Sequence, residues 1–97
     1  MKRGGHVYIM TNKRYGVLYV GVTADLAARA TQHREGTGGE FTSKYRCTRL
    51  VYVEEFATIE EAITREKAMK AWKREWKIEA IEEQNPTWDD LYLKLLA

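Results

Sequence analysis

The sequence has few of the residues that cross-link a chain or carry it through a membrane. Its single cysteine, Cys47, cannot form an intramolecular disulfide, which fits the reducing cytoplasm. No run of about 18 apolar residues is present, so no segment is expected to span a membrane. The N-terminal MKRGGH has no apolar stretch behind its charges, which argues against a signal peptide. We therefore expect a cytoplasmic protein without membrane attachment.

Internal repeats and low-complexity segments are also missing, which excludes solenoid and disordered classes. What is present is a globular composition, with three tryptophans and six tyrosines to bury. A chain of 97 residues has room for one modest core. We expect residues 1–97 to form a single domain.

Charge is distributed unevenly along the chain. Residues 1–50 contain nine Lys and Arg against three Asp and Glu, whereas residues 51–97 contain seven against eleven. A basic N-terminal half suits a polyanionic partner such as nucleic acid. A solvated surface of mixed sign explains the same counts, so charge alone leaves both interpretations open.

Three segments are rich in β-branched and aromatic residues, as strands are: residues 6–11, 17–22 and 48–56. The polar turn between the first two predicts a β-hairpin. If Thr11 faces Gly16 across a four-residue turn, Tyr8 lies opposite Tyr19. Both phenols then share one sheet face with His6 and Gly21, and the other face is aliphatic and forms the core. The tyrosines are either a packing pair or a pair with chemistry to perform.

Helix signals occupy most of the remaining chain. Thr23 or Asp25 begins a helix over residues 24–34, and a capping box at Thr58–Glu61 opens another that runs to about Trp72. Helix continues over 73–83 until the proline-containing Asn85-Pro86, and a short helix or turn follows over 87–95. Residues 36–46 form a Gly-rich loop. The order β-β-α-β-α-α predicts an α+β domain with a small three-stranded sheet.

Polar residues at helical spacing supply further candidates. Arg29 and His33 are one helical turn apart and lie on the same face of the predicted helix. They either contact a phosphate together or are two unrelated surface side chains. Glu66 lies within an apolar stripe, where a carboxylate must be paired, hydrogen-bonded or bound to a metal unless it reaches water at the stripe's edge. Trp72 and Trp76 stand among basic residues, and we favour a core stripe over a nucleic-acid face.

In combination these residues resemble the GIY-YIG nuclease domain. Tyr8 and Tyr19 stand in the segments Val7-Tyr8-Ile9 and Tyr19-Val20-Gly21, with ten residues between the two tyrosines. Arg29, His33 and Glu66 follow in the family's order, and Asn85-Pro86-Thr87-Trp88 resembles the ending of its short stand-alone bacterial members. The resemblance covers nearly the whole chain and implies a three-stranded antiparallel sheet flanked by helices.

The resemblance implies a role for each matched residue. Tyr8 is the general base or positions the water, and Tyr19 hydrogen-bonds the phosphate or that water. Arg29 stabilises negative charge, with His33 assisting by hydrogen bonding or proton transfer. Gly21 leaves space for the substrate backbone, and Glu66 holds one divalent ion, Mg²⁺ or Mn²⁺. The remaining candidates for substrate binding are Arg34, Lys44 and Asn85.

A free tyrosine has a pKa of about 10 and is a poor base at neutral pH. Arg29 and the metal are the groups expected to lower the pKa of Tyr8. Two features depart from the family pattern. His6 stands where the first name-giving glycine is expected, and the loop 36–46 lacks the histidine of some members, for which Lys44 and Tyr45 are candidate substitutes.

The expected activity is metal-dependent endonucleolytic cleavage of DNA, structure-specific in the manner of repair or recombination enzymes. Because no second DNA-binding module is seen, a protein partner is expected to supply specificity. The alternative is a nucleic-acid-binding module with weak or no catalysis. A third possibility is a protein-interaction domain that uses the acidic C-terminal half.

Overall fold

The structure, a computed structural model, describes residues 4–96. Residues 1–3 and 97 lie outside the described part, and residues 1–3 belong to the N-terminal segment on which the signal-peptide expectation depends. The antiparallel sheet has the order β2-β1-β3 and confirms the predicted α+β class. Its strands are β1 (Gly5–Thr11), β2 (Leu18–Thr23) and β3 (Arg49–Phe56). The helices are α1 (Leu26–Arg34), α2 (Glu40–Lys44), α3 (Ile59–Ala71), α4 (Arg74–Gln84) and α5 (Tyr92–Leu96). The short helix α2 was predicted as loop.

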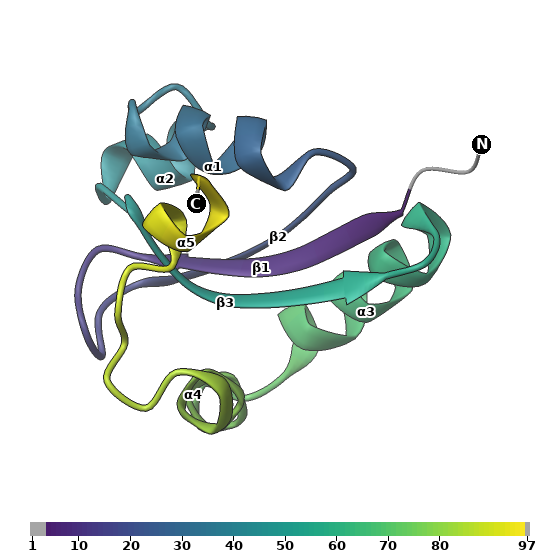
Figure 1. Cartoon of the computed structure of the whole chain (residues 1–97). Helices are drawn as coiled ribbons and strands as arrows, with labels where there is room; N and C mark the ends of the chain where they lie inside the picture. Colours follow the sequence, from purple (N-terminus) through teal and green to yellow (C-terminus); the bar gives the residue numbers. More distant parts are fainter. Residues whose placement is uncertain (1–3, 97) are drawn as a thin grey trace.

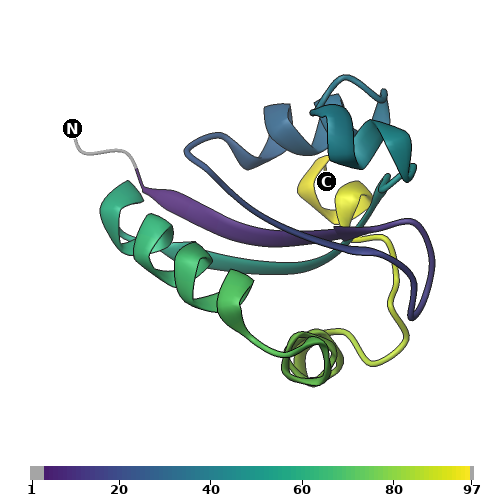
Figure 2. The same ribbon diagram turned by 180° about the vertical axis from the view of Figure 1, so that it is seen from behind.

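Helices cover both faces of the sheet. Helices α1, α2 and α5 lie on one side, and α3 and α4 lie on the other (Figures 1 and 2). On the α3 side, Val7, Ile9 and Val20 pack against Ala62 and Met69. On the α1 side, a second core gathers around Tyr8. The prediction of one core face was therefore incomplete, because the tyrosine face is buried as well.

The hairpin register differs from the predicted one by two residues. Thr11 lies opposite Leu18, and Tyr8 lies opposite Gly21 instead of Tyr19. The turn is wider than expected, since Tyr15 adopts a left-handed φ of 58° and Asn12 Oδ1 accepts a hydrogen bond of 2.9 Å from the Val17 N–H. A two-residue shift preserves the alternation of faces, so both tyrosines still point to the same side.

The predicted helix caps are confirmed. The Asp25 carboxylate accepts from the Ala28 N–H at the start of α1, and the Thr58 hydroxyl accepts from the Glu61 N–H at the start of α3. Helix α3 ends before Trp72, where the backbone becomes extended and the chain bends into α4. None of the helices in the described part of the chain is both long and apolar enough to cross a bilayer.

The outer edge of β3 is closed by side chains from the segment after α3. Gln84 hydrogen-bonds both the N–H and the carbonyl of Val53, at 2.9 and 2.7 Å. Asp90 Oδ1 accepts from the Leu50 N–H at 3.1 Å, and Asn85 Nδ2 donates to the Val51 carbonyl at 3.1 Å. These side chains take the place of a neighbouring strand.

Candidate active site

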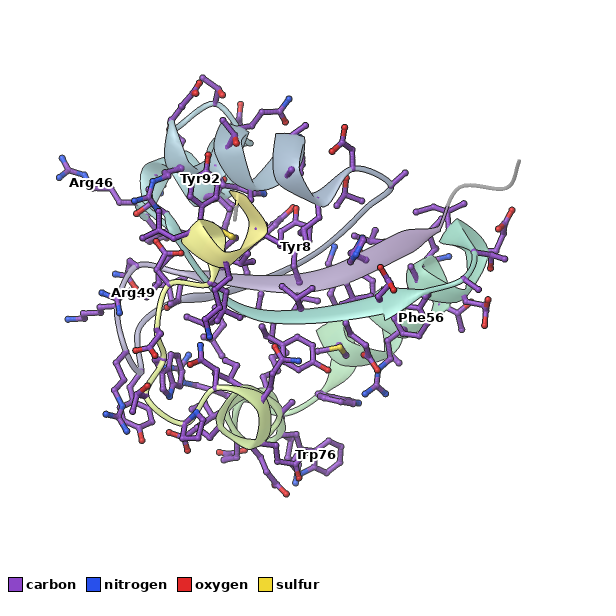
Figure 3. The ribbon with its side chains drawn as sticks, in the orientation of Figure 1. Tyr8, Arg46, Arg49, Phe56, Trp76 and Tyr92 are labelled. Atoms are coloured by element: carbon purple, nitrogen blue, oxygen red, sulfur yellow. The ribbon has the colours of Figure 1, made fainter. Side chains whose placement is uncertain are left out.

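The centre of the site is a buried contact between β1 and α1. Tyr8 Oη lies 2.9 Å from His33 Nε2, and each side chain is 1% exposed. The two rings meet at a centroid distance of 5.5 Å. Figure 3 shows Tyr8 on the face of the sheet beneath α1. Two residues selected from the sequence, 25 positions apart, are thus direct partners.

Tyr19 completes a cluster of three rings. Its centroid lies 6.3 Å from that of Tyr8 and 5.4 Å from that of His33. Tyr19 is half-buried, and on its outer side Phe41 follows at 6.0 Å. The cluster therefore leads from a water-free interior at Tyr8 to the protein surface at Phe41, which is exposed.

Arg29 stands beside both phenols. One of its N–H groups donates to Gln32 Oε1 at 3.0 Å, and hydrogen bonding and charge from the guanidinium favour the phenolate of Tyr8. Burial is nevertheless the larger effect, and it raises the pKa of Tyr8 to about 12. The expectation that Arg29 brings the pKa of Tyr8 below its usual value is wrong for the free protein, because the phenolate would lose more hydration than one guanidinium restores.

His33 is neutral at physiological pH. Burial first, and the charge of Arg29 second, lower the pKa of His33 to about 4. A neutral imidazole keeps one nitrogen lone pair, which can accept a proton. That lone pair is on Nε2, which faces the Tyr8 hydroxyl, in one tautomer of the ring and on Nδ1, which faces Thr42, in the other.

Two glycines make room for these rings. A Cβ on Gly21 would lie 2.4 Å from Cζ and Oη of Tyr8, and a Cβ on Gly38 would lie 2.2 Å from His33 Nδ1. The space above Gly21 is filled by the phenol across the strand pair. The expectation that it accommodates the substrate backbone is corrected accordingly.

Thr42 is a site residue that sequence reasoning missed. Its Oγ1 lies 3.0 Å from His33 Nδ1, and the side chain is 2% exposed. The family pattern led us to expect a histidine in this loop, or Lys44 or Tyr45 in its place, whereas the threonine on α2 makes the contact. Lys44 lies over the ring of Tyr45, at 5.4 Å. Only the short helix α2, which the Gly-rich composition obscured, would have pointed to Thr42.

Glu66 comes from α3, on the other face of the sheet. Its side chain is 12% exposed, and Oε2 lies 3.1 Å from Lys70 Nζ. The predicted stripe holds for Ala62 and Met69, which are buried, but Ile63 is exposed. Glu66 is therefore a largely buried carboxylate paired with a cation, one of the outcomes expected from its position.

A cleft of about 290 Å³ lies at the β2 edge of the sheet and is lined by residues from the helices on both faces. Tyr19 and Phe41 line it from the α1 side, and Lys70 and Lys77 line it from the α3 side. The lysine that pairs with Glu66 therefore shares a cleft with Tyr19. Aromatic surface next to two ammonium groups suits a ligand with bases and phosphates.

The donor set limits what metal this region could hold. Among residues 4–96, no group of three or more His, Cys, Asp or Glu side chains could hold an ion. Mg²⁺ commonly takes one or two carboxylates, with waters and substrate phosphates as its other ligands. Glu66 fits such an ion shared with a phosphate, and it does not fit a site built from protein ligands alone.

Several sequence candidates are engaged elsewhere. Arg34 pairs with Asp90 at 2.6 Å and lies over the ring of Tyr92 at 4.7 Å. Asn85 is buried and bonds only backbone groups, those of Val51 and Asp89. Ion pairing and edge closure occupy the polar groups of these two residues in the free protein, and their substrate-binding roles stay predictions.

His6 and the tryptophans also have defined surroundings. His6 Nε2 lies 3.3 Å from Glu55 Oε2 on the neighbouring strand. Trp72 packs against the first core, with Arg65 at 4.9 Å from its ring, whereas Trp76 is 52% exposed. The core interpretation is right for Trp72 and wrong for Trp76, which Figure 3 shows pointing away from the sheet below α4.

Comparison with known proteins shows the family of this chain. Residues 4–79 match the GIY-YIG catalytic domain. A UPF0213 protein of Staphylococcus epidermidis is 38% identical over 68 residues, which cover 70% of this chain and 83% of that protein. A UPF0213 protein of Staphylococcus haemolyticus is 38% identical over 79 residues, 81% of this chain and 95% of that one.

A solved structure has a similar fold. The solution NMR structure of a UPF0213 protein from Bacillus halodurans superposes with a TM-score of 0.56 at 28% identity, over 90% of this chain and 92% of that chain. The tyrosine pair, the arginine–histidine turn and the glutamate thus occur in a chain whose domain match and fold agree. The chain belongs to the GIY-YIG family of nuclease domains, among its short UPF0213 proteins.

Proposed function

We propose that this protein is a metal-dependent endonuclease that hydrolyses phosphodiester bonds in DNA. The observation that carries the proposal is the Tyr8–His33 contact of 2.9 Å, in which a neutral imidazole meets a buried phenol beside Arg29. A packing pair of tyrosines needs neither the histidine nor the arginine. Phosphodiester hydrolysis needs a base for water and a cation for the phosphate.

The high pKa of Tyr8 restricts how its proton leaves. A pKa of about 12 makes release to solvent at pH 7 rare, but transfer to His33 Nε2 creates a phenolate–imidazolium pair inside the site. Arg29 stabilises the phenolate through its charge. The Tyr8 oxygen then takes the proton of the attacking water, and His33 carries the excess proton until the product leaves.

The remaining residues bind the substrate. Tyr19 donates its hydroxyl to the phosphate, and Lys70 and Lys77 hold the nucleic-acid backbone in the cleft that they line with it. Glu66 is the residue that would hold one Mg²⁺ or Mn²⁺ ion. When bound, that ion supplies charge stabilisation at the leaving oxygen.

The test compares cleavage of flap, nicked, single-stranded and duplex DNA with Mg²⁺, Mn²⁺ or a chelator. Cleavage should need the metal and disappear in Tyr8→Phe and Glu66→Gln. Glu60→Gln is the matched control, since Glu60 is an exposed acid on the same helix. Preference for nicked or flap DNA would support a role in repair or recombination. Equal cutting by Glu66→Gln would sink the metal mechanism.

A second candidate is a nucleic-acid-binding module with weak or no catalysis. It is favoured by the single carboxylate at Glu66, which Lys70 already neutralises. This candidate expects salt-sensitive DNA binding without cleavage of any of the four substrates. Cleavage lost in Tyr8→Phe would exclude it. A protein partner that brings the domain to its substrate is compatible with either candidate.

A further inference from the structure

We propose that Thr42 is a positioning residue that keeps the proton of the neutral His33 ring on Nδ1, so that Nε2 is the nitrogen that accepts from Tyr8. The tautomer concerns the free protein and needs no catalysis. Its consequence for cleavage rests on the proposed nuclease function.

The argument starts from two short contacts on opposite sides of one ring. His33 Nε2 lies 2.9 Å from Tyr8 Oη, and His33 Nδ1 lies 3.0 Å from Thr42 Oγ1. All three side chains are buried, so water does not compete for these atoms. A neutral imidazole has one N–H and one lone pair, and each hydroxyl has one proton to donate. The cluster therefore has two possible polarities.

The groups next to Tyr8 and Thr42, at the two ends of this row of contacts, decide between the two polarities. The Arg29 guanidinium, beside the Tyr8 oxygen, only donates, and the Gly39 carbonyl, 3.4 Å from Thr42 Oγ1, only accepts. With donation running from Tyr8 towards Gly39, the Tyr8 hydroxyl donates to Nε2 and Nδ1–H donates to Thr42. Thr42 then donates to Gly39, and every link is satisfied.

The opposite polarity has two defects. Tyr8 Oη would accept from Nε2–H, so the phenol proton would have to turn away from His33 although the Arg29 guanidinium beside the phenol offers it no acceptor. Thr42 would have to turn its proton away from Gly39 to reach Nδ1.

The backbone around Thr42 restrains the position of the His33 ring. Gly38 lies so close to His33 that a Cβ there would meet Nδ1 at 2.2 Å, and helix α2 begins two residues later. The loop and the helix together hold the Thr42 hydroxyl against the Nδ1 side. A neutral ring in this position has little freedom to flip.

The direct test is NMR of ¹⁵N-labelled protein at pH 7. His6→Gln removes the second imidazole, because His6 and His33 are the only histidines in the sequence. A long-range ¹H–¹⁵N spectrum should then show His33 Nδ1 with a protonated-type shift and Nε2 with a lone-pair shift. The reverse assignment in otherwise unaltered protein would overturn the proposal.

Two substitutions test the role of the hydroxyl itself. Thr42→Val keeps the shape and removes the hydrogen bond, and we expect a mixed or reversed tautomer with kcat lowered about tenfold or more and KM unchanged. Thr42→Ser keeps the hydroxyl and should retain both the tautomer and kcat. Thermal unfolding of each variant identifies loss of fold. An unchanged tautomer in folded Thr42→Val would refute the role of Thr42.

Failure of the nuclease proposal gives a different pattern of results. If no DNA substrate is cut but the spectrum shows Nδ1–H and responds to Thr42→Val, the tautomer assignment stands and the proposed function falls. If DNA is cut and the spectrum shows Nε2–H, the reverse holds.

Discussion

Tyr8 and His33 share a hydrogen bond of 2.9 Å in a part of the protein from which water is excluded. Burial moves their proton affinities in opposite directions, since it penalises the phenolate on one side and the imidazolium on the other. Both groups are therefore held neutral in the free protein. In the proposed mechanism, a proton therefore moves between them only when the bound substrate supplies charge that compensates for the separation.

The depressed pKa of His33 makes stability depend on pH. Between the unfolded value of 6.5 and the folded value of about 4, the unfolded chain binds the extra proton, so stability falls as pH falls through this window. We expect a loss of up to about 3 kcal/mol across it. Urea unfolding at pH 7 and 4.5 measures the loss, and His33→Gln should lack this part of it. Equal pH dependence in both proteins would contradict the assignment.

Removal of the Tyr8 hydroxyl should separate binding from catalysis. Tyr8→Phe is expected to lower kcat about 10²-fold or more, since the proposed base is lost. Stability should drop by about 1–3 kcal/mol, because His33 Nε2 loses its buried partner. DNA affinity should be unchanged. Tyr15→Phe serves as the control, because that exposed hydroxyl binds Glu82 on α4. Retained cleavage by Tyr8→Phe would exclude Tyr8 as the base.

Gly21 offers a steric test of the same site. In Gly21→Ala the new methyl group would press on the Tyr8 ring, and we expect a stability loss of about 1–3 kcal/mol together with loss of cleavage. Gly36→Ala is the comparison, because Gly36 has a left-handed φ of 81° and no neighbour that a methyl group would meet. Backbone strain should cost it about 1 kcal/mol without affecting kcat. Unfolding and cleavage assays read both effects.

The cleft lysines should contribute to DNA affinity through phosphate contacts. Lys70→Gln combined with Lys77→Gln removes two ammonium groups from the cleft at β2. The slope of log K against log salt for single-stranded DNA should fall by about 1.4, the value for two lost phosphate contacts. Lys94→Gln on α5 should leave the slope unchanged. An unaltered slope in the double variant would remove the cleft from the DNA-binding surface.

Removal of the divalent ion should abolish cleavage without unfolding the protein. Within residues 4–96 no group of three or more potential metal ligands gathers, and Glu66 is paired with Lys70. We therefore expect a chelator to stop cleavage while the circular dichroism spectrum and Tm are preserved. Restored cleavage on addition of Mg²⁺ or Mn²⁺ completes the test, and cleavage that persists in chelator would argue against the metal.

The sequence was sufficient for features that depend on local pattern. Alternation along the strands put Tyr8 and Tyr19 on one face, and the cap at Thr58 was correct because capping uses contacts within four residues. The register was not predictable to the residue, because Tyr15 is an unusual residue for a left-handed turn position.

The local sequence pattern could not predict side-chain partners that are far apart in the sequence. Arg34 and Asp90 are 56 residues apart, and nothing local indicates that this arginine pairs with that acid. Thr42 reaches His33 only because α2 forms in a glycine-rich segment. Burial in the second core raises the pKa of Tyr8. The aliphatic pattern on the opposite face of the sheet did not predict that the tyrosine face is buried too.

Because side chains close the β3 edge, the sheet could be extended only at its other edge. Gln84, Asn85 and Asp90 occupy the positions that another strand would take, so a further strand could be added only along β2. Two copies joined through sheet extension would meet at that border. The cleft lined by Tyr19, Lys70 and Lys77 lies at that border, so self-association by this route would compete with the proposed binding of nucleic acid.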